Sequence, residues 1–315
     1  MQPGTTTWSV VATVRATHSL CDLFARHYLA LGARKVFLFH DDPGMVSGVH
    51  RDGVRNTVCD ARWWQRGRPK ALEKWQVHNA TQARDWCETE WLLHCDVDEL
   101  LWSEQPVSDL LAALPDDVGG VRVRPAEAVY ASPPTEDELF ATPYFKFFHD
   151  KGRGRAYRDI SLRAYGELWE ASKYGFWGHV VGKSFMRATA PLGRMPLHGK
   201  RREEIAGFRM HHVADRMVLR HYDTLSPGLW KEKHPRRIRG EVATPMAGRL
   251  RERQQKLIAA AALAGEPELE RLYLRMATLP PDMLAECIAQ GFVRVIPPEP
   301  HLLEDAPADA GAVTI

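Results

Sequence analysis

Strand and helix patterns alternate along the first 125 residues, and this alternation constrains the fold more than any other feature of the chain. Apolar runs rich in β-branched and aromatic residues predict buried strands at residues 8–14, 35–40, 54–58 and 91–95. Apolar residues at helical spacing predict helices between them, at 18–31 and 70–86. Such alternation is typical of a mostly parallel sheet with helices on both faces. We therefore expect an α/β fold with a doubly wound sheet.

The last of these strands ends in a pair of aspartates. Asp96 and Asp98 are separated by Val97 and followed by Glu99. In an extended chain, two residues separated by one project to the same side, so both carboxylates can face one cation. Carboxylate oxygens suit Mg²⁺ or Mn²⁺, and open α/β sheets bind ligands at the carboxyl ends of their strands. The alternative is a solvated acidic turn that enters a helix, because carboxylates are favourable at a helix N-terminus.

Three segments together resemble the family 2 glycosyltransferases, whose GT-A fold is Rossmann-like. They are residues 26–32 (RHYLALG), 36–42 (VFLFHDD) and 91–100 (WLLHCDVDEL). The branch with an Asp-x-Asp-Glu signature fits best. The resemblance continues more weakly through residues 178–184 and 219–223, so it covers roughly residues 8 to 235. One departure is that residues 15–18 read RATH, where these proteins often carry an acidic triplet.

The resemblance implies a metal-dependent transferase. Such an enzyme moves a sugar, typically a hexose, from a nucleotide-sugar donor to a hydroxyl of a glycan or glycolipid acceptor, with inversion, as in polysaccharide biosynthesis. The implied donor is a UDP-sugar, and the implied cofactor is Mn²⁺ or Mg²⁺, which neutralises the leaving diphosphate. The metal ligands that it implies are Asp96, Asp98 and His221. The donor-binding residues that it implies are Asp41, Asp96, His179 and Lys183.

Several of these residues also have plain structural interpretations. Asp41 begins an Asp-Asp-Pro-Gly turn, which favours aspartate in any case. Lys183 lies in a Gly-rich stretch, GHVVGK, that is one residue too short for a P-loop and also reads as a β-turn with a surface lysine. His211 or His212 can take the role assigned to His221. Glu99 is either a group behind the metal or a helix cap.

An inverting transferase also needs a carboxylate that takes the proton from the acceptor hydroxyl. Glu127 is the first candidate, because it follows the short strand VRVR downstream of the aspartate pair. Asp159 and Glu170 are its rivals. The sequence does not choose among the three, and a surface carboxylate is the ordinary role of each.

Composition indicates a cytoplasmic protein. The net charge of +2 gives no argument for a nucleic-acid partner, and five cysteines without CxxC spacing indicate free thiols in a reducing compartment. No secretory segment follows Met1, and no apolar run approaches the roughly 20 residues of a membrane helix. Basic clusters at 201–202, 231–233 and 236–239 are ordinarily a solvated face, but they also suit a peripheral contact with the inner face of a membrane or an acidic glycan.

The chain changes character near Pro227. We expect a GT-A glycosyltransferase domain at residues 1–226, a helical extension at 227–296 and a flexible tail at 297–315. The extension contains predicted helices at 248–265 and 267–279 and a third that ends near residue 290.

Two other functions are compatible with the same residues. A nucleotidyltransferase would use the same carboxylates and bind a triphosphate. A catalytically silent relative would bind a glycan or a protein partner without turnover. The sugar, the acceptor, the stereochemistry and the oligomeric state are not encoded in any pattern that we recognise.

Overall fold

The computed structural model describes residues 6–41, 48–65, 67, 69, 71–135, 138–148, 154–178, 180–198, 208–212, 216–222, 228, 230 and 249–303. The chain divides into two compact units that interleave in sequence. The first unit comprises Met1–Arg124 and Val181–Leu219, and the second comprises Pro125–Val180 and Arg220–Thr314. The predicted division at residues 226 and 296 stays a prediction.

The first unit is built on a parallel sheet. Its elements follow the predicted order: β1 (Trp8–Val14), α1 (His18–Ala30), β2 (Val36–His40), β3 (Val54–Val58), α2 (Leu72–Asp85) and β4 (Trp91–His94). Strand β1 pairs in parallel with β2 on one side and with β4 on the other, and β2 pairs in parallel with β3. The spatial order is therefore β4-β1-β2-β3. This confirms the predicted α/β fold with a mainly parallel, Rossmann-like sheet.

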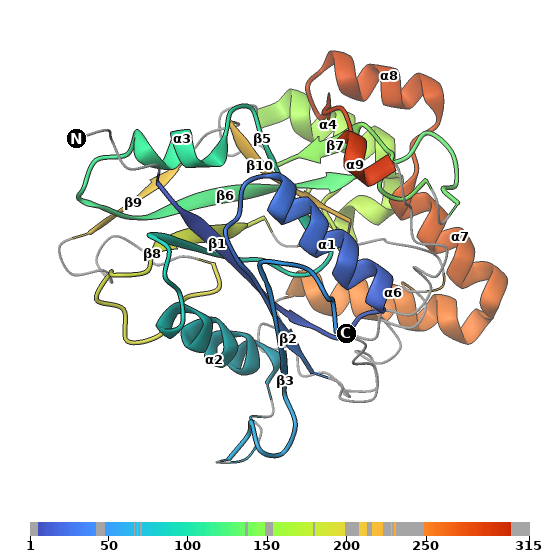
Figure 1. The fold of residues 1–315 in the computed structure, drawn as a ribbon. Coiled ribbons are helices and arrows are strands. Elements are labelled where there is room, and N and C mark those ends of the chain that lie inside the picture. The colour runs from blue at the N-terminus through green and yellow to red at the C-terminus, as the bar shows by residue number, and fades with distance from the viewer. Residues whose placement is uncertain are drawn as a thin grey trace. The chain divides into compact units, whose positions relative to one another are not determined.

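The two helices of this sheet lie on opposite faces. The connection from β1 to β2 and the connection from β3 to β4 step in opposite directions across the sheet, so right-handed crossovers place their helices on different sides. Figure 1 shows α1 and α2 on either side of β1 and β2. The doubly wound arrangement follows from this.

Alternating side chains fill the two faces. Val11 and Phe37 pack with Ala80 and Ala83 of α2. On the opposite face Trp8 meets Tyr28 of α1 edge to face. Both faces are apolar because each is covered by a helix, which is why the strands read as continuous apolar runs rather than as alternating ones.

Further strands extend this sheet beyond β4. They are β5 (Glu99–Ser103), β6 (Val118–Ala128), β8 (Lys183–Arg187), β9 (Arg209–His212) and β10 (Met217–His221), with the helix α3 (Val107–Ala112) between β5 and β6. Strand β8 runs antiparallel to both β4 and β6, and β9 runs parallel to β6. Strands β6 and β10 continue from the first unit into the second.

The second unit combines a small sheet with helices. Strand β7 (Tyr144–Phe147) pairs antiparallel with the end of β6 and with β11 (Val293–Val295). Its helices are α4 (Gly154–Tyr165), the 3₁₀ helix η2 (Gly166–Ala171), α6 (Arg249–Ala264), α7 (Glu266–Ala277), α8 (Pro281–Ala289) and α9 (Pro300–Leu303). The helices predicted from the C-terminal sequence are α6, α7 and α8.

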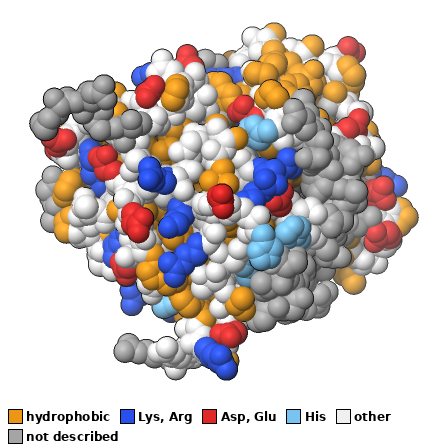
Figure 2. All heavy atoms as spheres, in the orientation of Figure 1, with side chains coloured by type: hydrophobic (Ala, Val, Ile, Leu, Met, Phe, Trp, Pro, Cys, Tyr) orange, Lys and Arg blue, Asp and Glu red, His pale blue; other side chains and the backbone are white. Residues whose placement is uncertain are grey.

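The cysteines, the membrane helices and the charged surface were also subjects of sequence predictions. All five cysteines are free thiols, as predicted. Among the helices of the described residues, none is both long and apolar enough to cross a membrane. On the face drawn in Figure 2, basic and acidic side chains are interspersed. The predicted basic clusters and the last part of the predicted tail, from residue 304, lie outside the described residues.

Candidate functional site

The aspartate pair follows β4 at the point where the strand order reverses. The chain leaves β1 for β2 on one side, and β4 lies on the other side of β1. The backbone N–H of Asp41, after β2, donates to Val14 at 2.8 Å, and that of Cys95, after β4, donates to Val11 at 3.0 Å. Open α/β sheets bind ligands outside the carboxyl ends of their strands at such a switch point. Asp41 and Asp96 therefore follow the two strands that flank β1 at this edge.

Residues 96–99 form a closed turn rather than an extended segment. The backbone N–H of Glu99 donates to the carbonyl of Asp96 at 3.0 Å, and the N–H of Asp96 donates to Glu99 Oε2 at 2.9 Å. The expectation that Asp96 and Asp98 project from one side of a strand is therefore wrong, because β4 ends at His94. Glu99 is fully buried, Asp98 is 2% exposed, and the Asp96 side chain is 30% exposed.

Lys183 is the cation of this turn. Its Nζ lies 2.6 Å from Asp96 Oδ2 and 3.5 Å from Glu99 Oε2, and its side chain is 2% exposed. Burial alone would lower the pKa of Lys183, but the charges of Asp96 and Glu99 and the hydrogen bond to Asp96 raise it above its ordinary value. The lysine is not a surface residue of a β-turn. Its ammonium is already engaged by two carboxylates.

A residue outside the predicted set completes the surroundings of Asp96. Gln76 on α2 donates from Nε2 to Asp96 Oδ1 at 2.7 Å. One turn later, Asn79 donates to Thr13 Oγ1 of β1 at 3.0 Å. The sequence signal that could have revealed this contact is the pair of amides, Gln76 and Asn79, on one face of the predicted helix. Buried amides need hydrogen-bond partners, so two of them together indicate polar groups beneath the helix. Each carboxylate oxygen of Asp96 thus accepts a hydrogen bond from a neighbouring element.

The arrangement does not fit a divalent ion bound at Asp96, because an ammonium and an amide engage its two oxygens. Across the described residues, no three His, Cys, Asp or Glu side chains are grouped so that they could hold a metal ion. The assignment of Asp96, Asp98 and His221 as metal ligands stays a prediction. His179 lies outside the described residues.

Gly182 sets the backbone that brings Lys183 to the turn. Its φ is +76°, and a Cβ at this position would lie 2.0 Å from the carbonyl oxygen of Val123. Its own carbonyl accepts a hydrogen bond from His198 Nδ1 at 2.8 Å. A side chain here would meet both an unfavourable φ and a backbone atom, so only glycine fits.

We expect Gly182→Ala to lower the free energy of unfolding by about 3 kcal/mol, from backbone strain plus the clash with Val123. Gly32→Ala separates the two causes, because Gly32 has φ +92° but no atom within 4 Å of its Cβ position. We expect it to cost only about 1–2 kcal/mol. Gly193, with neither constraint, is the neutral control. Urea unfolding of the three variants checks this order, and equal losses at Gly182 and Gly32 would contradict it.

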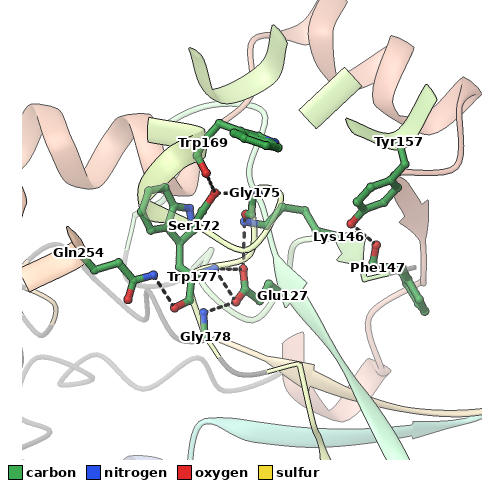
Figure 3. Close-up of polar contacts among 10 residues, drawn as sticks. All are labelled: Glu127, Lys146, Phe147, Tyr157, Trp169, Ser172, Gly175, Trp177, Gly178 and Gln254. Carbon is green, nitrogen blue, oxygen red and sulfur yellow. Dashed lines mark hydrogen bonds and ion pairs between the residues drawn. The ribbon is translucent and has the colours of Figure 1, made fainter. Parts of the chain in front are cut away.

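In the second unit, Glu127 is held in a buried ion pair (Figure 3). Its carboxylate accepts hydrogen bonds from the backbone N–H groups of Trp177 and Gly178, and Lys146 Nζ lies 3.0 Å from Oε2. Lys146 also donates to the carbonyl of Gly175 at 2.8 Å. Both side chains are at most 5% exposed. An acceptor hydroxyl would have to displace one of these donors to reach the carboxylate, so the geometry favours a structural role for Glu127.

Lys146 is charged in these surroundings. Burial alone would lower its pKa, but Tyr165 and Glu127 raise it above the ordinary value. The ammonium also lies 5.0 Å from the ring centroid of Tyr165. The pair ties the loop at residues 175–178 to strands β6 and β7.

His221 lies beside the same loop. A Cβ on Gly178 would be 2.9 Å from His221 Cε1 and 3.0 Å from Glu127 Oε1. Gly178 therefore fits between the imidazole ring and the carboxylate. From α6, Gln254 Nε2 donates to the carbonyl of Trp177 at 3.1 Å. The structure thus brings together two predicted site residues, Glu127 and His221, in the second unit.

The other two candidate bases are surface residues. Asp159 lies 3.8 Å from Arg155, with side chains 58% and 95% exposed. Glu170 lies 3.7 Å from Arg253, with side chains 73% and 59% exposed. Exposed ion pairs of this kind contribute little to stability. The choice among the three candidates stays a prediction.

Comparison with known proteins gives no family. No protein-family model matches the chain. No curated protein matches it either. Among solved structures, the chain is similar to a putative glucose-1-phosphate thymidylyltransferase from Bacillus anthracis in complex with a sucrose, with 7% sequence identity and a TM-score of 0.26. The match covers 46% of this chain and 61% of that one, so this chain spans less than two thirds of its neighbour. A TM-score this low establishes neither a shared fold nor a shared activity.

Proposed function

We propose that the protein is a glycosyltransferase that moves a hexose from a nucleotide-sugar donor to a hydroxyl of a glycan or glycolipid acceptor, with inversion. The observation that carries the proposal is the turn at residues 96–99, which follows β4 at the switch point of the parallel sheet. Ligands of open α/β sheets bind at this edge. The resemblance of this stretch to the Asp-x-Asp-Glu glycosyltransferases supports the same function.

The geometry supports a specific role for Asp96 in this function. Gln76 and Lys183 fix its carboxylate, which is still 30% exposed. A fixed and partly exposed carboxylate is a good acceptor for hydroxyl groups of a ribose or a sugar, because its orientation costs no entropy on binding. Asp41, after β2 at the same edge, is a second acceptor for the nucleoside. Both residues therefore position the donor in this proposal.

The predicted Mn²⁺ or Mg²⁺ would neutralise the diphosphate leaving group if it were bound. The residues around Asp96 do not provide its site, so no step of the proposal depends on the ion. Glu127, Asp159 and Glu170 remain the predicted candidates for the acceptor base. A UDP-sugar remains the predicted donor, and a peripheral membrane contact remains a prediction.

The test is thermal stabilisation by a panel of nucleoside diphosphates, each with EDTA or with Mn²⁺. A ligand that binds only the folded state raises its stability by an amount that grows with its concentration relative to Kd. We expect one diphosphate to raise the midpoint by several degrees at about 100 times Kd. We expect the shift to fall sharply in Asp96→Asn and to persist in Asp85→Asn, an exposed carboxylate at the end of α2.

Two outcomes decide between this proposal and its rivals. A shift with triphosphates but not with diphosphates would favour a nucleotidyltransferase. No shift with any nucleotide, with or without Mn²⁺, would refute the nucleotide-sugar assignment.

A further inference from the structure

A row of polar side chains crosses the sheet of the first unit at its ligand-binding edge. Leu93 of β4 lies opposite Phe185 of β8, and extending this antiparallel register by one residue along both strands brings His94 opposite Ser184. Ser184 lies opposite Arg122 of β6, and Arg122 lies opposite His212 of β9. The row therefore contains His94, Ser184, Arg122 and His212, one from each of four adjacent strands. We call it the polar row.

The polar row lies on the α2 face of the sheet. The residues two positions away on the same strands are Leu92, Met186, Gly120 and Met210, and side chains two apart share a face. Leu92, Met186 and Met210 pack in the apolar cluster with Ala80 and Ala83 of α2. A Cβ at Gly120 would contact the sulfur atoms of both methionines. Two residues farther along β4, toward its carboxyl end, the same face of the sheet is therefore polar instead of apolar.

Three members of the polar row carry buried hydrogen-bonding atoms without partners. They are both ring nitrogens of His94, Oγ of Ser184 and Nε of Arg122. His94 and Ser184 are fully buried. In a neutral imidazole, one ring nitrogen carries a hydrogen and can donate it. An unsatisfied buried polar atom costs about 1–3 kcal/mol, and most such atoms in folded proteins have partners. Several together indicate that a ligand supplies them.

The chemistry of the row suits an anion. Arg122 offers only donors and a permanent positive charge. Ser184 and His94 each offer a donor, and none of the three carries a negative charge. Planar guanidinium groups are the preferred partners of phosphate oxygens. The turn at residues 96–99 does not offer a cation for an anionic ligand, because the ammonium of Lys183 is paired with Asp96 and Glu99.

We propose that the polar row binds the diphosphate group of the donor. This inference rests on the proposed function. The guanidinium of Arg122, rather than the ammonium of Lys183, would neutralise the diphosphate, and Ser184 and His94 would donate hydrogen bonds to it. The diphosphate would then lie beside β4, β8 and β6, while Asp96 and Asp41 accept hydrogen bonds from the sugar and the nucleoside. His212, at the far end of the row, extends it toward β9.

Isothermal titration of the full chain with inorganic pyrophosphate, UDP and uridine tests the inference. We expect pyrophosphate and UDP to bind, and Arg122→Gln to weaken both by about tenfold or more, because a charged hydrogen bond is lost. Ser184→Ala should weaken both by about fivefold while leaving the protein at least as stable, because it removes an unsatisfied buried hydroxyl. Arg55→Gln, an exposed arginine on β3, is the matched control and should change nothing.

The outcomes separate this inference from the proposed function. If UDP binds equally well to wild type, Arg122→Gln and Ser184→Ala, the polar row is not the diphosphate site, and the proposed function still stands. If pyrophosphate binds through Arg122 but no nucleotide binds, the anion site stands and the nucleotide-sugar assignment fails. If pyrophosphate does not bind at all, the inference is overturned.

Discussion

Lys183→Met is expected to lower the free energy of unfolding by about 3–5 kcal/mol, because it leaves buried carboxylates without their cation. Glu99 is fully buried, and Lys183 Nζ is within 3.5 Å of it and within 2.6 Å of Asp96. Methionine has a similar length and fills the same space, so the loss reports charge rather than packing. Guanidinium chloride unfolding of the variant measures it.

A second substitution shows whether the loss comes from charge. Glu99→Gln keeps an oxygen that can accept from the N–H of Asp96 but removes the buried negative charge. We therefore expect Lys183→Met with Glu99→Gln to be more stable than Lys183→Met alone. Arg155→Gln, which breaks an exposed pair, should cost less than about 1 kcal/mol. If Lys183→Met costs no more than Arg155→Gln, the buried pair does not stabilise the turn.

The same variant bears on the predicted metal. Without Lys183, Asp96 and Glu99 would lose the ammonium that neutralises them, and the turn would be a better site for a divalent ion than the native turn. Stabilisation of Lys183→Met by Mn²⁺, with none in wild type, would mean that the lysine takes the place of an ion at Asp96. Stabilisation of wild type by Mn²⁺ alone would instead support the metal ligands predicted from the sequence.

The sheet of the first unit was predictable because its signals are local. Each parallel strand is covered on both faces, so it appears as a short apolar run. The helix α1 carries Thr17 as a cap, whose Oγ1 accepts from the N–H of Leu20, and it ends before Gly32 at φ +92°. The position of Asp96 after a strand follows from the same patterns. The hydrogen bond between Asp96 and Gln76 does not follow from them, because these patterns determine neither the rotation of α2 about its axis nor its position along the strands that it covers.

The site chemistry depends on pairings that are distant in sequence. Lys183 and Asp96 are 87 residues apart and meet only because β8 runs antiparallel beside β4. The alternation that predicts parallel strands says nothing about this antiparallel addition. The polar row was hidden for the same reason, since each member is a single polar residue on its own strand and only the register aligns them.

The candidate base shows a different limit of sequence reasoning. Glu127 was placed after a strand, whereas it lies within β6, opposite Lys146 of β7. A carboxylate directly opposite a lysine in an antiparallel pair is a common cross-strand ion pair. The sequence does not reveal that Lys146 is the partner of Glu127, because the length of the connection between β6 and β7 does not determine which of their residues pair.

Breaking the pair between Glu127 and Lys146 is expected to destabilise the second unit strongly. Lys146→Met should cost about 3–5 kcal/mol, because it leaves the buried carboxylate of Glu127 without the ammonium that lies 3.0 Å from it. Glu127→Gln should cost a similar amount, because it leaves the Lys146 ammonium buried without a counter-ion. Combining the two changes should cost clearly less than their sum, because the double variant contains no uncompensated charge. Urea unfolding of the four proteins gives the coupling energy.

The cycle also separates the two roles of Glu127. In the structural role, the loss of stability in Glu127→Gln is accompanied by loosening of residues 175–178, which hydrogen exchange at the N–H groups of Trp177 and Gly178 detects. Nucleotide binding by the first unit should then be unchanged, because Glu127 belongs to the second unit. In the catalytic role, Glu127→Gln would abolish sugar transfer while leaving the unfolding free energy and the exchange rates at their wild-type values. That outcome would contradict the structural role and restore Glu127 as the acceptor base.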